Sequence, residues 1–263
     1  MVKQGTAAAR SKARSTNRHS PKIVLCVGLK SSGSTWLYNV IAEILRTQRR
    51  AKKKAPHGRS GGVVQFYADN VDSFPEGAEG ASILVVKTHI PSRSLQFLTN
   101  FAAAHVFLTV RDPRDAIASV MQRFGHPFDG ALAEIAKGAA LMVNFAKLYD
   151  PPIFQYERRF YDDPETVQEV ARLLKVRLSP SESERIFAAY TREKVGRMIR
   201  RLEERGLFGP NADPDRFEPR SHWHPGHVGN LIIGKYREAL SPKQQRATLS
   251  ITKEFCRAFG YCL

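Results

Sequence analysis

Short apolar runs alternate with longer amphipathic segments along most of this chain. The run Ile23–Val27 is rich in β-forming residues and ends at Gly28, which predicts a buried parallel strand. Runs of the same kind predict strands at Ile83–Val86, His105–Val110 and Ile153–Tyr156. Apolar residues at spacings of three and four predict helices over Thr35–Arg46, Ser92–Ala104, Arg114–Arg123, Leu132–Leu148, Pro164–Leu174 and Pro242–Phe259. This alternation predicts an α/β fold of three layers, with a central parallel sheet flanked by helices.

The first twenty residues differ from the rest of the chain in composition. They are basic, contain no acidic residue and carry almost no large apolar side chain, so they cannot bury enough surface to offset the entropy of ordering. We therefore expect a disordered basic tail over residues 1–20 and a single domain over residues 21–263. A mitochondrial transit peptide, which is also rich in Arg and Ser, is the alternative for this tail.

Composition excludes several classes of protein. With 42% hydrophobic and 25% charged residues, the chain is typical of a soluble globular domain. No apolar run approaches the roughly 20 residues that a membrane-spanning helix needs, and the first residues lack the apolar core of a secretory signal. The cysteines Cys26, Cys256 and Cys262 form no CxxC pair, which argues against a disulfide framework and a cysteine-built zinc site. We expect a reducing, cytoplasmic location.

A strong excess of positive charge predicts an anionic ligand. Lys and Arg number 41 against 25 for Asp and Glu, a formal charge of +16. Nucleic acid, anionic lipid, an acidic glycan and a polyphosphate cofactor all stay open on charge alone. Much of the excess lies in residues 1–22 and 46–59, and such runs are usually solvated. Capture of an acidic or membrane-bound acceptor is the functional alternative, so peripheral membrane contact stays open.

The segment Gly28–Thr35, with the sequence GLKSSGST, has the glycine spacing of a phosphate-binding P-loop. Its glycines and the following helix N-terminus would present backbone N–H groups to a phosphate. Ser34 stands where nucleotide triphosphatases carry their lysine, whereas Lys30 lies inside the loop. The strand His105–Val110 runs into Arg111 instead of the metal-binding aspartate, so ordinary ATP or GTP hydrolysis is disfavoured. A plain strand–turn–helix with serine caps is the alternative.

Two further strands end in residues that would face this loop, because a doubly wound sheet binds ligands at the carboxyl ends of its strands. The strand Ile83–Val86 runs into KTHIP, which places Lys87 and His89 at that edge. A histidine, with an ordinary pKa of about 6.5, can act as a general base. Tyr156 ends another strand and could stack on a base. An ordinary strand exit and a core aromatic are the alternatives for these positions.

The segment RDPRDAIAS follows the strand that ends at Val110. Pro113 suits the first turn of a helix and Asp112 its N-cap. Arg111 then lies at the strand end and Ser119 two turns into the helix, so both could bind one phosphate. The alternative is an ion-pair cluster of Arg111, Asp112 and Asp115 at the helix start.

In this order, KSSGSTW, KTHIP, RDPRDAIAS and QYE resemble the motifs of the PAPS-dependent sulfotransferase family over roughly residues 22 to 174. PAPS is 3′-phosphoadenylyl sulfate. The resemblance implies a P-loop-like fold, with His89 as the catalytic base and Lys87 and Lys30 as catalytic lysines. It places at the nucleotide Lys30, Ser31, Ser32, Gly33, Ser34, Thr35, Trp36, Arg111, Ser119, Tyr156, Gly226 and His227.

The chain departs from the family pattern at two places. The family's phosphosulfate lysine stands immediately before Ser-Gly-x-Thr, where this chain has Ser31, and Lys30 lies one residue earlier. The family's Arg-Lys-Gly near the C-terminus is replaced by HPGHVGN, beginning at His224. The Pro- and Gly-rich loop over residues 206–230 contains this second segment.

The resemblance implies in-line transfer of a sulfonyl group from PAPS to a hydroxyl or amine of a small-molecule, lipid or glycan acceptor. It implies neither a metal nor a nucleic-acid partner, and the acceptor is expected to contact residues 56–80, 124–131 and 192–230. A P-loop small-molecule or nucleoside kinase and a noncatalytic basic nucleic-acid-binding protein are the alternatives. The spacing of His222, His224 and His227 is compatible with zinc, but in such a loop we expect them to cap the site. Oligomeric state stays open.

Overall fold

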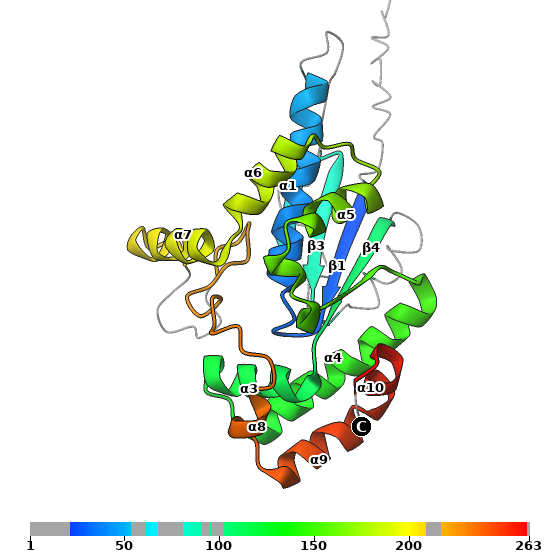
Figure 1. The fold of residues 1–263 in the computed structure, drawn as a ribbon, viewed down its shortest axis with the longest axis vertical. Coiled ribbons are helices and arrows are strands. Elements are labelled where there is room, and N and C mark those ends of the chain that lie inside the picture. Colours follow the sequence, from blue (N-terminus) through cyan, green and yellow to red (C-terminus); the bar gives the residue numbers. More distant parts are fainter. Residues whose placement is uncertain are drawn as a thin grey trace, which may run out of the picture.

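The computed structural model describes residues 22–53, 62–67, 81–90, 95, 103–208 and 217–261. Its five strands form one parallel sheet in the order β2-β3-β1-β4-β5 (Figure 1). The strands are β1 (Lys22–Gly28), β2 (Val63–Tyr67), β3 (Ile83–Thr88), β4 (Ala103–Val110) and β5 (Ile153–Gln155). The order places β1 at the centre and confirms the predicted parallel sheet.

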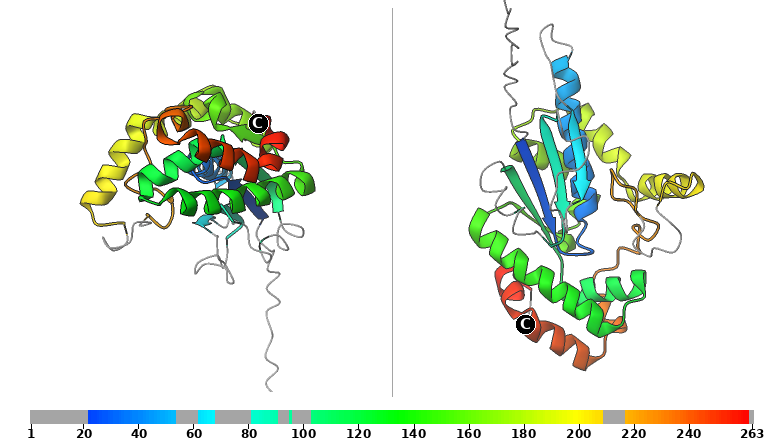
Figure 2. Two further views of the ribbon diagram at one scale, coloured as in Figure 1. Left: turned by 90° about the horizontal axis from the view of Figure 1, so that it is seen from below. Right: turned by 180° about the vertical axis from the view of Figure 1, so that it is seen from behind.

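Helices cover both faces of the sheet, as the prediction of three layers requires. Alternate residues of β1 divide between two cores: Ile23, Leu25 and Val27 join one, and Val24 and Cys26 join the other. This is the period of two that a strand imposes on its side chains. The first core packs against α3 (Pro113–Phe124), α4 (Phe128–Tyr149), α8 (Tyr236–Ala239) and α10 (Lys253–Phe259). The second packs against α1 (Ser34–Lys53), α5 (Glu165–Leu173), α6 (Pro180–Ala189) and α7 (Arg192–Glu204) (Figure 2).

Several predicted boundaries are wrong. The pattern missed β2, α6, α7 and α8, and α1 continues beyond Arg46 to Lys53. The helix expected over Pro242–Phe259 is divided at Thr252 into α9 (Pro242–Ile251) and α10. The hydroxyl groups of Thr248 and Thr252 each donate to the carbonyl four residues earlier. Such bonds bend a helix, which explains the break.

Two other predictions concern segments that lie partly or wholly outside the described residues. Of the helix expected over Ser92–Ala104, Leu95 is helical but the last two residues belong to β4. The remainder of that helix and the tail 1–20 lie outside the described residues. The strand expected to end at Tyr156 ends at Gln155, and Tyr156 begins a 3-10 turn. No described helix has the length and apolar character needed to cross a membrane.

The parallel sheet brings four chain segments to one edge. The loop after β1, the end of β3, the residue after β4 and the turn after β5 all lie at carboxyl ends of strands. These segments carry Gly33, Lys87, Arg111 and Tyr156. The fold therefore gathers at one edge the motifs that lie far apart in the sequence.

Candidate active site

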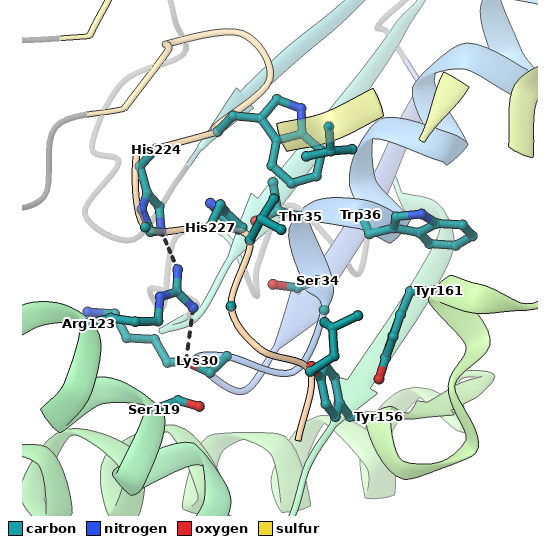
Figure 3. A pocket seen from close by; sticks show the side chains of 18 of the residues that line it. Lys30, Ser34, Thr35, Trp36, Ser119, Arg123, Tyr156, Tyr161, His224 and His227 are labelled. Carbon is teal, nitrogen blue, oxygen red and sulfur yellow. Dashed lines mark hydrogen bonds between the residues drawn. The ribbon is translucent and has the colours of Figure 1, made fainter. Parts of the chain in front are cut away.

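A cavity of 580 Å³ lies at this edge and collects the predicted site residues (Figure 3). Its size is within the range of small-molecule and cofactor sites, roughly 300–1,000 Å³. The predicted residues that line it are Lys30, Ser31, Gly33, Ser34, Thr35, Trp36, Lys87, His89, Arg111, Ser119, Tyr156, Gly226 and His227. Ser32 is the one predicted site residue that does not line this cavity.

The loop between β1 and α1 is held by bonds to β4. The Leu29 N–H donates to the Thr109 carbonyl at 3.0 Å. The Ser32 hydroxyl donates to the Leu29 carbonyl at 2.6 Å and lies 2.7 Å from the Thr109 hydroxyl, so it faces the fold. Gly33 has a φ of +81°, and a Cβ there would come within 2.9 Å of Phe160. The loop therefore needs a glycine where it turns into the helix.

The imidazole of His89 is fixed in one tautomer. Its Nδ1 lies 2.6 Å from the Gly28 carbonyl oxygen. A carbonyl can only accept, so Nδ1 carries the hydrogen and Nε2 holds the lone pair. The fully buried Lys87 places its Nζ 2.9 Å from that Nε2 and donates to it. The site therefore holds a neutral imidazole whose unprotonated nitrogen adjoins a cation.

Arg111 and Ser119 converge, as the spacing of their motif predicts. An Arg111 guanidinium nitrogen lies 3.2 Å from the Ser119 hydroxyl and 3.1 Å from the Ser31 carbonyl. Its guanidinium lies 4.0 Å from the centre of the Tyr156 ring. The buried carboxylate of Asp115 pairs with the other side of Arg111 at 3.4 Å. A cation, a hydroxyl and an aromatic ring thus meet at the ends of β4 and β5.

Residues 217–235, here called the covering segment, run across the cavity and are tied at both ends. Near its start, Tyr38 donates to the Arg220 carbonyl at 3.0 Å, and Asn39 to the Ser221 carbonyl at 2.8 Å. Near its end, the Gly234 N–H donates to Asp115 at 2.7 Å. These polar bonds to α1 and α3 determine which side chains the segment presents to the cavity.

Three histidines of the covering segment face the cavity as neutral side chains. Burial, helped by Arg123, lowers the pKa of His224 to about 2. Burial also lowers the pKa of His222 and of His227 well below the ordinary histidine value. The rings of His224 and His227 lie 4.1 Å apart, whereas His222 contacts Lys87 at 3.5 Å. Within the described ranges, no group of His, Cys, Asp and Glu could hold a metal ion.

Sequence reasoning missed two cations of the cavity, Arg123 and Lys235. Arg123 lies one helical turn beyond Ser119, so the spacing of α3 was a signal for it. Burial and Arg111 lower the pKa of Lys235 to about 8. The predicted Lys30 lines the cavity too, but its ammonium forms an ion pair with Glu134. The described cavity thus has more cationic side chains than the motifs indicate.

Comparison with known proteins assigns the family. The sulfotransferase domain model matches residues 21–195, which is more than half of the chain. Mouse sulfotransferase SULT7A1 complexed with PAP is similar in structure, with a TM-score of 0.61 and 14% identity over 92% of this chain and 86% of that one. Retinol dehydratase in complex with retinol and PAP has a TM-score of 0.58 and 15% identity over 91% of this chain and 82% of that one. No curated protein sequence matches the chain. The chain therefore belongs to the sulfotransferase domain family.

Proposed function

We propose that this sulfotransferase transfers the sulfonyl group of PAPS to a hydroxyl or amine of a small-molecule acceptor, with His89 as general base. The observation that carries the proposal is the lone pair of His89 Nε2 in the same cavity as the phosphate loop and the Arg111–Ser119 pair. Transfer from this nucleotide requires a base for the acceptor proton, a loop that binds the 5′ end and a pair of side chains that binds the 3′-phosphate.

The chemistry of the cavity fits an anionic nucleotide. Six of its side chains are cationic residues: Lys30, Lys87, Arg111, Arg123, Arg192 and Lys235. The buried Nε atoms of Arg111 and Arg123 and Nδ1 of His227 have no hydrogen-bond partner among the described residues. Such unpaired buried groups are costly, and a bound polyanion would satisfy them. Gly33, Ser34 and Thr35 with the α1 N-terminus would hold the 5′ end, and Arg111 with Ser119 the 3′-phosphate.

PAPS, when bound, supplies the sulfonyl group, and the side chains at the ends of β1 and β3 supply the proton chemistry. His89 takes the acceptor proton at Nε2, while its Nδ1–H bond to Gly28 keeps the ring in place. Lys87 gives up its bond to Nε2 when the acceptor hydroxyl occupies that position. Its buried ammonium then stabilises the negative charge that develops on the departing 5′-phosphate. Loss of such a group typically lowers the rate by about 10²–10³-fold.

The kinase alternative is disfavoured by the partners of Asp112, the only carboxylate directly after the end of β4. Its Oδ1 accepts from the Arg114 backbone N–H at 2.9 Å, and its Oδ2 pairs with the Arg114 guanidinium at 2.6 Å. A carboxylate that caps a helix and pairs with an arginine is not available to hold magnesium. Together with Ser34 in the lysine position, this favours sulfonyl transfer.

Aromatic walls next to His89 support an organic acceptor that carries an apolar ring or chain beside its hydroxyl or amine. The Tyr67 ring lies 6.0 Å from the His89 ring and 6.0 Å from the Phe217 ring. Such surfaces bury apolar rings and chains. A reducing cytoplasmic location also belongs to the proposal, since Cys26 and Cys256 are free and buried.

Calorimetry with PAP (3′-phosphoadenosine 5′-phosphate, the desulfated product) against ATP tests the proposed function. We expect PAP to bind at least about 100-fold more tightly than ATP without added magnesium, because Arg111 and Ser119 recognise a phosphate that ATP lacks. Labelled PAPS with a panel of phenols and alcohols then identifies the acceptor. Magnesium-dependent ATP binding that exceeds PAP binding would instead support the kinase.

Affinity for PAP is expected to fall as the pH rises above about 8. Lys235 has its pKa lowered to about 8 by burial and by Arg111, so its ammonium is charged below this pH and neutral above it. Attraction for a phosphate is therefore full below pH 8 and declines by up to about tenfold for each pH unit above it. Calorimetry at several pH values should show this decline in the wild type and a flatter profile in Lys235→Met. The same slope in both proteins would assign the decline to another group.

A further inference from the structure

The phosphate loop has no lysine immediately before Ser32 and Gly33, where related sulfotransferases carry one. Ser31 occupies that position, with a left-handed φ of +64°. The ammonium of the neighbouring Lys30 is bound outside the loop, because it pairs with Glu134 on α4 and lies 5.0 Å from the centre of the Phe124 ring. The loop itself therefore lacks a cation that is free of a carboxylate partner.

Arg123, from the last turn of α3, lies over this position. One of its terminal nitrogens donates to the Ser31 hydroxyl at 3.3 Å, and the other donates to Nε2 of His224. Figure 3 shows the guanidinium between the loop that carries Lys30 and the covering segment. Its Nε is buried without a hydrogen-bond partner in the described part of the chain.

The surroundings hold Arg123 in place without neutralising it. His224 accepts its hydrogen bond as a neutral ring, and no carboxylate among the described residues forms an ion pair with it. Burial and the nearby Arg111 lower the pKa of Arg123 to about 10, so the guanidinium stays charged at neutral pH. A charged group that is anchored by neutral partners and faces a cavity is poised to bind an anion.

We propose that Arg123 replaces the missing loop lysine and binds the 5′-phosphate side of the nucleotide. The inference rests on the proposed function, because it assigns a residue to the same nucleotide. It divides these two arginines of the cavity between the two ends of the ligand. Both guanidinium groups bond to Ser31, Arg123 to its hydroxyl at 3.3 Å and Arg111 to its carbonyl at 3.1 Å. Arg111 also donates to Ser119, on the side assigned to the 3′-phosphate, whereas the other bond of Arg123 goes to His224 of the covering segment.

Calorimetry with two nucleotides tests this division. Arg123→Met keeps the length of the side chain and removes its charge. We expect it to weaken PAP binding about 10- to 100-fold, the usual effect of a lost charge-assisted bond. Binding of adenosine 3′-monophosphate, which has no 5′-phosphate, should change less than about twofold. Arg246→Met removes an exposed arginine from α9 and serves as the matched control for lost charge.

A second variant asks whether position 31 and Arg123 perform the same task. Ser31→Lys places a lysine where the family has it, and the double variant Ser31→Lys with Arg123→Met should recover PAP affinity to within about tenfold of the wild type. Melting temperatures report whether each variant is folded. No recovery in a folded double variant, or equal losses of PAP and adenosine 3′-monophosphate in Arg123→Met, would overturn the assignment.

The outcome for the wild type separates this inference from the proposed function. If wild-type protein binds no PAP, the proposed function fails. If the wild type binds PAP and Arg123→Met binds it equally well, the proposed function stands and only the assignment of Arg123 fails. Unchanged PAP binding with a raised KM for the acceptor would move Arg123 to the acceptor side.

Discussion

Replacing His89 by alanine is expected to lower kcat by about 10²–10⁴-fold, the usual contribution of a general base. The affinity for PAP should change less than about threefold, because the phosphate loop and the Arg111–Ser119 pair stay in place. The reason lies in the orientation of the ring, whose Nδ1 is bound to Gly28 while Nε2 faces the cavity. Steady-state rates with labelled PAPS, together with calorimetry of PAP, measure both quantities.

The control for this variant is His105→Ala, which removes a half-buried histidine from the beginning of β4, at the opposite end of the strand from Arg111. Its kcat should stay within about threefold of the wild type. A parallel loss of turnover and of PAP affinity in His89→Ala would show that the ring supports the shape of the cavity and does not take the proton.

Asp115→Ala is expected to destabilise the protein by about 3–5 kcal/mol, since it leaves the buried guanidinium of Arg111 without its carboxylate. The same carboxylate accepts the N–H groups of Gly234 and Tyr236 at 2.7 and 3.0 Å, so the end of the covering segment also loses its attachment. Thermal unfolding should show a melting temperature lower by roughly 10 °C. PAP affinity should fall as well, because Arg111 loses its orientation.

Two further variants serve as comparisons for this loss of stability. Asp115→Asn retains an oxygen acceptor without the charge and should lose about half as much stability. Glu254→Ala removes an exposed carboxylate that pairs with Arg257 at 3.3 Å, and it should cost less than about 1 kcal/mol. A loss in Asp115→Ala no larger than that of Glu254→Ala would contradict the central position that we give to Asp115.

The strands at the centre of the fold could be predicted from the sequence because they are buried on both faces and therefore apolar throughout. Strand β2 could not be predicted because its middle residue, Gln65, is polar yet buried. Gln65 bonds to Asn39 and Arg46 on α1. Helix α7 was missed for a different reason. Its apolar residues Val195 and Ile199 have helical spacing, but many charged residues surround them. In both cases tertiary contacts stabilise an element that the local composition does not indicate.

The site was predictable where a strand end positions the residue. Lys87 and Arg111 follow apolar runs directly, and parallel strands bring their carboxyl ends together whatever the connections are. Arg123 does not follow a strand end, and its only signal is the helical spacing that places it one turn beyond Ser119 on α3. Lys235 was not predictable at all, since its place in the cavity depends on the path of the covering segment. That path is fixed by bonds from Tyr38, Asn39 and Asp115 to backbone groups more than a hundred residues away, and no local pattern indicates such partners.

The outer strand β5 has a consequence for behaviour in concentrated solution. It is only three residues long and directly follows Pro151 and Pro152. An exposed sheet edge recruits strands of other molecules through its free N–H and C=O groups, and short strands next to proline offer few of them. This side of the sheet is thereby protected against the edge-to-edge joining of molecules from which β-aggregates grow.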